Sequence, residues 1–167
     1  MKTINLAVYA AVFFVPAACL AAWEQESSRD EMRGTLTQSM QTTSINTVNF
    51  DPPYKKNARA MLVIRQQNGT TSVIVVMESG QLLCHITGCS ASIKFDDSPV
   101  KSVQGSPPDS HRSDVVFLTG TASLIAQMKK AKTLKVELPF YQSGKKVFTF
   151  NVEKLDWPPN KPSSPRK

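Results

Sequence analysis

The sequence has few of the residues from which most catalytic and metal sites are built, with two histidines and three cysteines among 167 residues. A structural zinc site needs four ligands, commonly arranged in two closely spaced pairs. Cys84, His85 and Cys89 supply three ligands at most, and His111 lies in a separate loop. We therefore predict that the chain holds no metal and needs no cofactor.

Catalytic motifs are also missing. Neither a Gly-x-Ser-x-Gly turn nor a Gly-rich phosphate loop occurs, and the acidic residues lack EF-hand spacing. A Ser/His/Asp group exists on paper in one Pro-rich loop, in Asp109, Ser110, His111 and Asp114. Such a loop lacks the framing that holds a nucleophile within reach of its base. Asp96-Asp97 is interpreted as a turn. We predict that the protein is not an enzyme.

No hydrophobic run has both the length and the flanks of a membrane span. Lys2 precedes an apolar run from Leu6 to Val15, and small residues follow from Pro16 to Ala22. This layout is typical of a secretory signal peptide. We expect residues 1–22 to be removed and the mature chain to begin near Trp23.

Cys19 offers an alternative processing route. Val15-Pro16-Ala17-Ala18-Cys19 is similar to a bacterial lipobox, although Pro16 stands where an aliphatic residue is usual. Ordinary cleavage predicts a periplasmic or secreted protein, whereas lipidation of Cys19 predicts an outer-membrane lipoprotein. We expect membrane contact only in the second case.

The stretch from Val73 to Phe95 indicates a disulfide-closed hairpin. We expect a strand over Val73–Met77, a second short strand ending at Cys84, and a third that begins at Cys89. Cysteines at the two feet of a tight antiparallel loop lie close enough to pair. We predict a structural disulfide between Cys84 and Cys89, which requires an oxidising compartment. The loop that it closes is a possible binding loop, formed by His85, Ile86, Thr87 and Gly88.

Hydrophobic periodicity predicts a β-rich fold. Every residue from Val73 to Met77 is apolar, which is typical of a central strand covered on both faces. Gln67-Asn68-Gly69-Thr70 predicts a hairpin turn. Further strands are expected at 35–39, 42–48, 61–64, 93–95, 115–118, 134–140 and 148–152. The sequence thus predicts an antiparallel β-sandwich or flattened barrel of about 7–9 strands with one α-helix.

That helix is expected over Thr121–Lys132, with Thr119 or Thr121 as its cap. Lys129, Lys130 and Lys132 then fall in the last turn. They form either a solvated face that offsets the helix dipole or a basic patch for an anionic partner.

The chain is expected to form a single β-rich domain over residues 23–157, followed by a disordered Pro/Lys-rich tail over 158–167. Trp23 and Trp157 bracket the domain as core or edge anchors. The formal net charge of +7 permits contact with anionic partners. Phe148 and Phe150 alternate as core residues rather than forming a stacking platform, so we expect no nucleic-acid partner.

Several packing motifs share an order with a known family. They are Trp23 followed by Asp30-Glu31-Met32, then 61–65 (MLVIR), 93–96 (IKFD), 116–118 (VFL), 130–134 (KAKTL) and 148–152 (FTFNV), through to Leu155 and Trp157. This order resembles small exported bacterial β-proteins of the type VI secretion-associated VasI/TagO-like family. Gln66 stands where the family pattern continues with a cysteine. The resemblance implies an envelope-spanning machinery as the setting and supplies no catalytic residue.

Together these features predict a non-enzymatic periplasmic or envelope-associated binding protein, an accessory of a secretion or conjugation apparatus, whose partner is a protein or a cell-envelope component. One alternative is an inhibitor of a hydrolase such as lysozyme, in which the loop from His85 to Gly88 plugs the active site. Another is a hydrolase with a site in the loop Gln104–Asp114.

Overall fold

The computed structural model describes residues 23–110 and 112–159. The predicted signal peptide, Cys19, His111 and residues 160–167 of the predicted tail lie outside the described residues.

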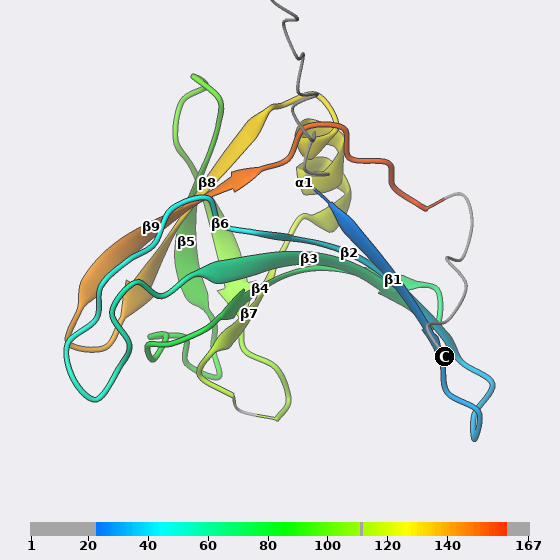
Figure 1. Cartoon of the computed structure of the whole chain (residues 1–167), viewed down its shortest axis with the longest axis horizontal. Helices are drawn as coiled ribbons and strands as arrows, with labels where there is room; N and C mark the ends of the chain where they lie inside the picture. The colour runs from blue at the N-terminus through cyan, green and yellow to red at the C-terminus, as the bar shows by residue number, and fades with distance from the viewer. Residues whose placement is uncertain (1–22, 111, 160–167) are drawn as a thin grey trace, which may run out of the picture.

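Nine strands form one antiparallel sheet in the order β1-β2-β3-β4-β7-β6-β5-β8-β9 (Figure 1). The strands are β1 (Glu24–Arg29), β2 (Leu36–Thr43), β3 (Ala60–Gln67), β4 (Thr70–Met77), β5 (Cys89–Phe95), β6 (Lys101–Ser106), β7 (Val115–Leu118), β8 (Thr133–Phe140) and β9 (Gly144–Asn151). One helix, α1 (Thr121–Met128), lies between β7 and β8. The prediction of a mainly antiparallel β fold with a single helix is confirmed.

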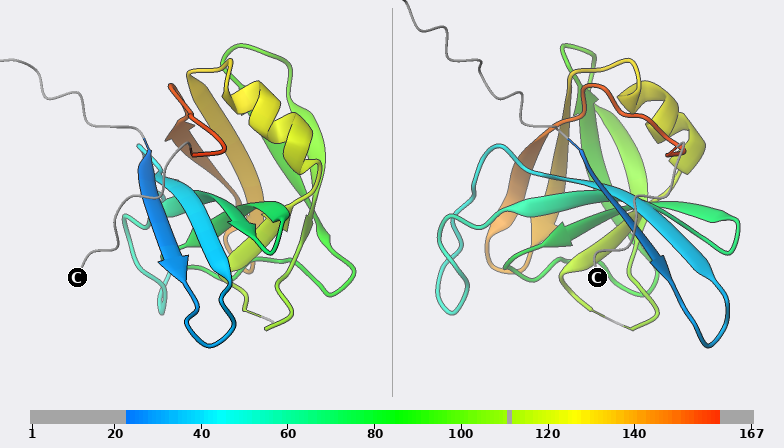
Figure 2. Two further views of the ribbon diagram at one scale, coloured as in Figure 1. Left: turned by 90° about the vertical axis from the view of Figure 1, so that its right-hand side faces the viewer. Right: turned by 45° about the vertical axis from the view of Figure 1, so that its right-hand side comes forward.

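The sheet is single and curls back on itself. In Figures 1 and 2, β5, β8 and β9 run steeply across the half that contains β1 to β4, and α1 lies beside the space between the two halves. The chain after β2 joins the halves, because Ile45 N donates to Thr149 O at 2.8 Å and Asn46 Nδ2 donates to Val147 O at 2.9 Å. Thr149 N in turn donates to Asn46 Oδ1 at 2.7 Å. Among the described residues the fold is one open, curled sheet, without the second sheet of a sandwich and without a β1–β9 pairing that would close a barrel.

The main core lies inside this curl. Leu62, Val75, Phe140, Phe148 and Phe150 are fully buried, as the alternating apolar residues of their strands predict. Trp23 and Trp157 are also buried in this core, which confirms them as anchors. The buried face of α1 packs into the same core through Leu124, Ile125 and Met128.

Some elements differ from the predictions because their sequences are polar. The segment Glu24–Arg29 forms β1 at the edge of the sheet, where both faces meet water and no apolar alternation is needed. Lys101–Ser106 forms β6, although part of it was expected to be a loop. Conversely, one strand, β2, stands in place of the two expected at 35–39 and 42–48, and residues 44–48 lie outside it apart from an isolated bridge at Val48.

The helix is shorter than predicted and has a different cap. It ends at Met128, with Lys129 as its C-cap, so Lys129, Lys130 and Lys132 follow the last turn. Its N-cap is Gly120 at φ 75°, without a side-chain hydrogen bond, so neither Thr119 nor Thr121 caps it. With eight residues it is far below the roughly 20 needed for a membrane span, and the described part of the chain contains no helix that could cross one.

The predicted disulfide is present, with Cys84 and Cys89 Cα atoms 4.7 Å apart. The expected strand ending at Cys84 is not formed. Instead, Leu82 makes an isolated bridge to Phe140, and His85 bridges Gly88 within the loop. Leu82 N donates to Ser113 O, and the segment before Cys84 forms no continuous strand pairing. The disulfide therefore joins a loop to Cys89, the first residue of β5.

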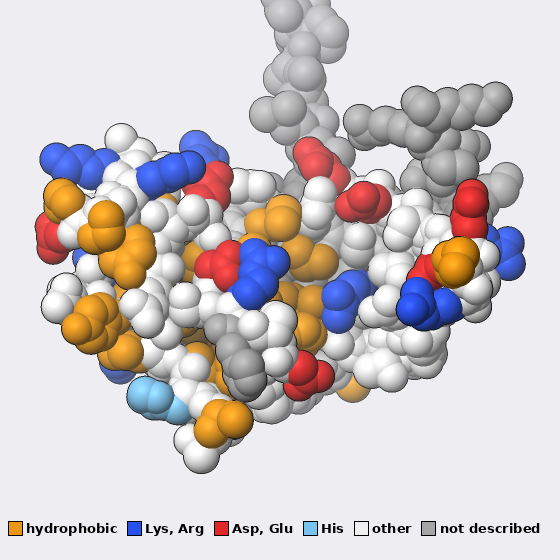
Figure 3. Space-filling view, turned by 90° about the horizontal axis from the view of Figure 1, so that it is seen from below, with side chains coloured by type: hydrophobic (Ala, Val, Ile, Leu, Met, Phe, Trp, Pro, Cys, Tyr) orange, Lys and Arg blue, Asp and Glu red, His pale blue; other side chains and the backbone are white. Residues whose placement is uncertain are grey.

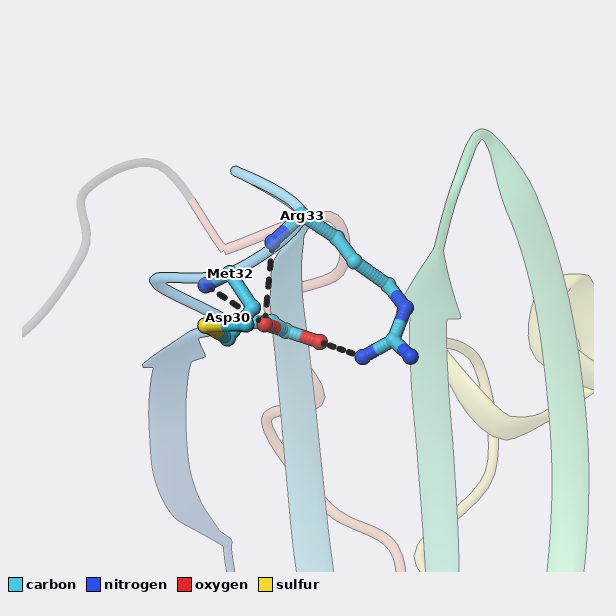
Figure 4. Close-up of polar contacts among 3 residues, drawn as sticks. All are labelled: Asp30, Met32 and Arg33. Carbon is cyan, nitrogen blue, oxygen red and sulfur yellow. Dashed lines mark hydrogen bonds and ion pairs between the residues drawn. The ribbon is translucent and has the colours of Figure 1, made fainter.

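A compact turn holds β1 against β2. The Asp30 carboxylate accepts hydrogen bonds from Met32 N at 2.9 Å and Arg33 N at 3.1 Å, and Arg33 Nη1 pairs with its other oxygen at 3.1 Å (Figure 4). The hydrogen bond from the Arg33 side chain is the largest cause that lowers the pKa of Asp30. This turn sets the position of β1, which forms one rim of the site described next.

Candidate binding groove on the outer face of the sheet

The half of the sheet made of β1, β2, β3, β4 and β7 has a second apolar face that points away from the main core. Register places its side chains in rows across the strands. One row is Glu26, Ser39, Arg65 and Ser72; the next is Glu24, Gln41, Val63, Ile74 and Phe117; the third is Thr43, Met61, Val76 and Val115. The apolar centre therefore lies between an acidic rim on β1 and a loop beyond β7.

Two side chains show that this face is partly covered. Ile74 is only 5% exposed and Val115 only 9% exposed, yet neither belongs to the main core. They lie on the other side of the sheet, with Val76 and Phe117 half-buried beside them. The prediction that β4 is a central strand with both faces covered is confirmed, and this second apolar cluster is the reason.

The cover is the loop between β6 and β7. Met77 N donates to Asp114 O and Leu82 N donates to Ser113 O, both at 2.8 Å, which fixes the end of the loop to the sheet. Arg112 forms a two-point ion pair with Asp114, with Nε to Oδ1 at 2.9 Å and Nη2 to Oδ2 at 2.5 Å. Hydrogen bonding from Arg112 lowers the pKa of Asp114 and raises that of its own guanidinium.

Sheet and loop together enclose a groove of about 380 Å³. Its lining residues are Glu26, Ser39, Gln41, Met61, Val63, Arg65, Ile74, Val76, Pro108, Ser110, Arg112, Val115 and Phe117. Figure 3 looks onto this side of the molecule, where hydrophobic side chains occupy the middle of the face and acidic and basic side chains flank them. An apolar floor with a few polar groups, in a volume above 300 Å³, is typical of a ligand site.

Arg65 is the most unusual member of the groove. Its Nε is buried and has no hydrogen-bond partner among the residues that the structure describes, and its guanidinium carbon lies 5.8 Å from the centre of the Phe117 ring. Its neighbours across the sheet, Ser39 and Ser72, carry no charge. Within the described residues the Arg65 guanidinium forms no ion pair, whereas Arg112 is neutralised by Asp114.

The opposite rim is acidic. Glu26 lies two strands from Arg65 in the same row, which corresponds to about 10 Å between the two backbones. Glu24 stands one row away and accepts a hydrogen bond from Gln41 Nε2 at 3.4 Å. The groove thus presents a positive group over its centre and a negative group at its edge, separated by hydroxyl and amide side chains.

The predicted binding loop lies elsewhere and is not part of the groove lining. His85, Ile86 and Thr87 are exposed, with Ile86 at 81%. Gly88 is required at its position because its φ is 101° and a Cβ there would approach Gly105 O to 2.8 Å. The loop is therefore closed by the disulfide, and at Gly88 its backbone lies too close to β6 to leave room for a side chain.

The predicted basic patch is exposed and also lies outside the groove. Lys129, Lys130 and Lys132 form no ion pair with any described residue. Binding of an anionic partner by these lysines stays a prediction. The main chain beside them is fixed by Asp96, whose carboxylate accepts from Thr133 N at 2.8 Å and Lys132 N at 3.1 Å. The turn predicted for Asp96-Asp97 is confirmed.

The Ser/His/Asp group considered from the sequence lies partly in the groove wall. Ser110 lines the groove, Asp114 forms an ion pair with Arg112, and His111 lies outside the described residues. Among the residues that the structure places, no cluster of three or more His, Cys, Asp or Glu side chains could hold a metal ion.

Sequence patterns did not single out Arg65, Glu26 or Phe117 as site residues. The available signal was the uninterrupted apolar run of β4 beside Met61–Ile64 in β3, which indicates two covered faces but not what covers the second. The arrangement can bind an elongated ligand with an apolar part and a charged part. Comparison of the chain with protein-family models, curated proteins and solved structures gives no match.

Proposed function

We propose that this protein is a non-enzymatic binding protein that works outside the cytoplasm, as an accessory of an envelope assembly such as a secretion or conjugation apparatus. The observation that carries the proposal is the groove on the outer face of the sheet, with its apolar floor and an arginine without an anionic partner among the described residues. The resemblance of the packing motifs to VasI/TagO-like proteins supports the same setting.

Binding explains the groove better than chemistry does. A hydrolytic site needs a nucleophile beside a base, and no histidine or cysteine lines the groove among the described residues. Ser39 and Ser110 are its hydroxyl groups, and no side-chain base is hydrogen-bonded to either of them. The polar groups are instead spread around an apolar floor, which suits recognition of a ligand that carries both kinds of surface.

The compartment is part of the proposal. A disulfide at Cys84–Cys89 is compatible with an oxidising environment, and the leader-like first 22 residues favour export to the periplasm or the medium. Lipidation of Cys19 would place the protein at the outer membrane. Intact mass of protein purified from cells tests this, since cleavage near Trp23, a lipid on Cys19 and the oxidised disulfide each give a distinct mass. A full-length mass with Cys84 and Cys89 both reduced would contradict export.

Site-directed photo-crosslinking in intact envelopes tests the role of the groove. A photoreactive residue at Ser39, on the groove lining, should give a discrete adduct. The same residue at Ala122, on the exposed side of α1, is the matched control and should give none. Val63→Asp, which places a charge on the apolar floor, should remove the Ser39 adduct without unfolding the chain. Equal labelling at both positions would contradict the proposal.

A second candidate function is inhibition of a cell-wall hydrolase by the loop from His85 to Gly88. The observation that favours it is the 81% exposure of Ile86 on a loop that the disulfide holds in shape, because preordered loops lose little entropy on binding. Inhibition of a lysozyme that disappears in Ile86→Asp and persists in Val63→Asp would support it. Inhibition that survives Ile86→Asp combined with His85→Ala, or that is absent from the unmodified protein, would remove it.

A further inference from the structure

We infer that the groove recognises the C-terminal carboxylate of a peptide whose last side chain is aliphatic, with Arg65 as the group that binds the carboxylate. This inference rests on the proposed function and specifies the ligand of the same groove.

The first step is the charge of Arg65. A guanidinium carries five N–H donors in a planar fork that matches a carboxylate, and it stays charged at all ordinary pH values. In this chain no described residue accepts a hydrogen bond from it, and its guanidinium carbon lies 5.8 Å from the centre of the Phe117 ring. A partly buried arginine beside an aromatic ring in this way can donate its N–H groups to one anionic group.

The second step is the distance from Arg65 to the apolar floor. Val63 lies two residues along β3 from Arg65, so their side chains lie on the same face about 7 Å apart. Ile74 and Phe117 extend the floor from Val63 in the same row. A terminal residue whose carboxylate meets Arg65 can therefore place its own side chain on this floor.

The third step excludes a more highly charged ligand. Arg112 is already paired with Asp114, which offsets its charge in part, and Glu26 stands on the rim of the same groove. A phosphate or other dianion would meet one free cation and a nearby carboxylate. A monoanion on an apolar body suits the groove better.

The fourth step favours a peptide over an acyl chain. Between Glu26 and Arg65 the groove offers the hydroxyl of Ser39, the next row adds the amide of Gln41, and Ser110 also lines the groove. Peptide N–H and C=O groups need hydrogen-bond partners when they leave water, whereas methylene groups need none. Glu26 can in addition accept from an upstream N–H or cationic side chain.

Binding of a matched ligand pair tests the inference. The probes are acetyl-Ser-Ala-Leu with a free carboxylate and the same peptide with a C-terminal amide, titrated against the full mature protein by calorimetry. The free acid should bind at least about tenfold more tightly, as expected for a charge-assisted hydrogen-bonded pair. Octanoate serves as the third probe and should bind more weakly than the free-acid peptide.

Arginine variants assign the effect to its residue. Arg65→Gln should abolish the difference between acid and amide, and Arg65→Lys, which keeps the charge but not the fork, should reduce it. Arg29→Gln is the matched control, since Arg29 is exposed on β1 and does not line the groove. It should leave the difference unchanged. Melting curves of all three variants show whether the fold is retained.

The outcomes separate this inference from the proposed function. Equal binding of acid and amide, or tighter binding of octanoate than of the peptide, overturns the inference, and a groove adduct at Ser39 would then still support the proposed function. A preference for the acid that persists in Arg65→Gln also overturns it. Absence of any Ser39 adduct contradicts the proposed function itself.

Discussion

At the scale of single residues, two carboxylates, Asp30 and Asp96, stabilise the fold by accepting hydrogen bonds from main-chain N–H groups. Asp30 closes the turn between β1 and β2, and Asp96 fixes the chain where α1 leads into β8. Asp96 lies at φ 42°, a conformation that aspartate tolerates better than most side chains, and its own N–H donates to Thr133 O. Asp-Asp after a strand predicted the turn, but not the contact with Thr133, which is 37 residues away.

Asp96 makes stability depend on pH in the acid range. Hydrogen bonding from Thr133 N is the largest cause that lowers the pKa of Asp96 below its ordinary value of 3.8. A carboxyl whose pKa is lowered on folding stabilises the folded chain at pH values above its unfolded pKa, and loses this effect as the pH falls through the folded pKa. We predict that Asp96→Asn is less stable than the unmodified protein at neutral pH and that the difference disappears below pH 3.8.

Urea unfolding between pH 2 and pH 7 measures this difference. Asp97→Asn is the control, because Asp97 is exposed and its carboxylate has no hydrogen-bond partner among the described residues. A constant difference between Asp96→Asn and the unmodified protein over the whole pH range would contradict the role given to Asp96.

Arg65 shows where prediction from the residues fails at this scale. In the sequence it is one basic residue at the end of an apolar run, and nothing there indicates that its neighbours across the sheet are serines or that Phe117 lies beneath it. Those contacts come from β2, β4 and β7, and they exist only once the register of four strands is set.

At the scale of elements, strands with an apolar pattern were predictable and polar strands were not. The hairpin of β8 and β9 and the turn at Asn68-Gly69 follow directly from alternation and turn chemistry. β1 and β6 are held by hydrogen bonds to their neighbours, and their polar side chains carry no periodic signal. The predicted C-terminal end of the helix was wrong, because lysines are favourable both in the last turn of a helix and in the chain that follows it.

The contribution of the disulfide to the free energy of unfolding can be measured. Cys84 and Cys89 close a loop with a sequence separation of 5, for which loop-closure entropy gives about 2 kcal/mol of stabilisation. We predict this loss of unfolding free energy in the double variant Cys84→Ser, Cys89→Ser, together with faster proteolysis within residues 85–88. Unchanged proteolysis there would show that the contact of Gly88 with Gly105 suffices to hold the loop.

The join between β9 and the chain after β2 is a second element with a clear test. Asn46 makes two hydrogen bonds to the β9 main chain, at 2.9 and 2.7 Å. We predict that Asn46→Ala lowers the free energy of unfolding by about 2 kcal/mol and speeds hydrogen exchange in β9.

Asn49→Ala is the comparison, since Asn49 accepts one hydrogen bond from Asn57 within its own loop and should cost less. Equal losses in the two variants would indicate that the two halves of the sheet do not depend on this join.

At the scale of the whole molecule, one curled sheet makes two apolar surfaces. Its inner surface forms the main core, whereas its outer surface is partly covered by the loop between β6 and β7 and keeps a groove of about 380 Å³. The sequence predicted the fold class and the doubly covered strand, because both depend on local patterns. It did not predict the groove, because that needs the loop and four strands in register.

The measurement that tests the central claim most directly is a residue-by-residue NMR titration of the mature protein with the free-acid peptide acetyl-Ser-Ala-Leu. We predict that the largest amide and methyl shifts fall on the groove face of β2, β3, β4 and β7, centred on Arg65, Val63 and Phe117, and that residues 85–88 and 129–132 stay unchanged. Shifts confined to those two segments, or absent from the groove at saturating peptide, would contradict the claim.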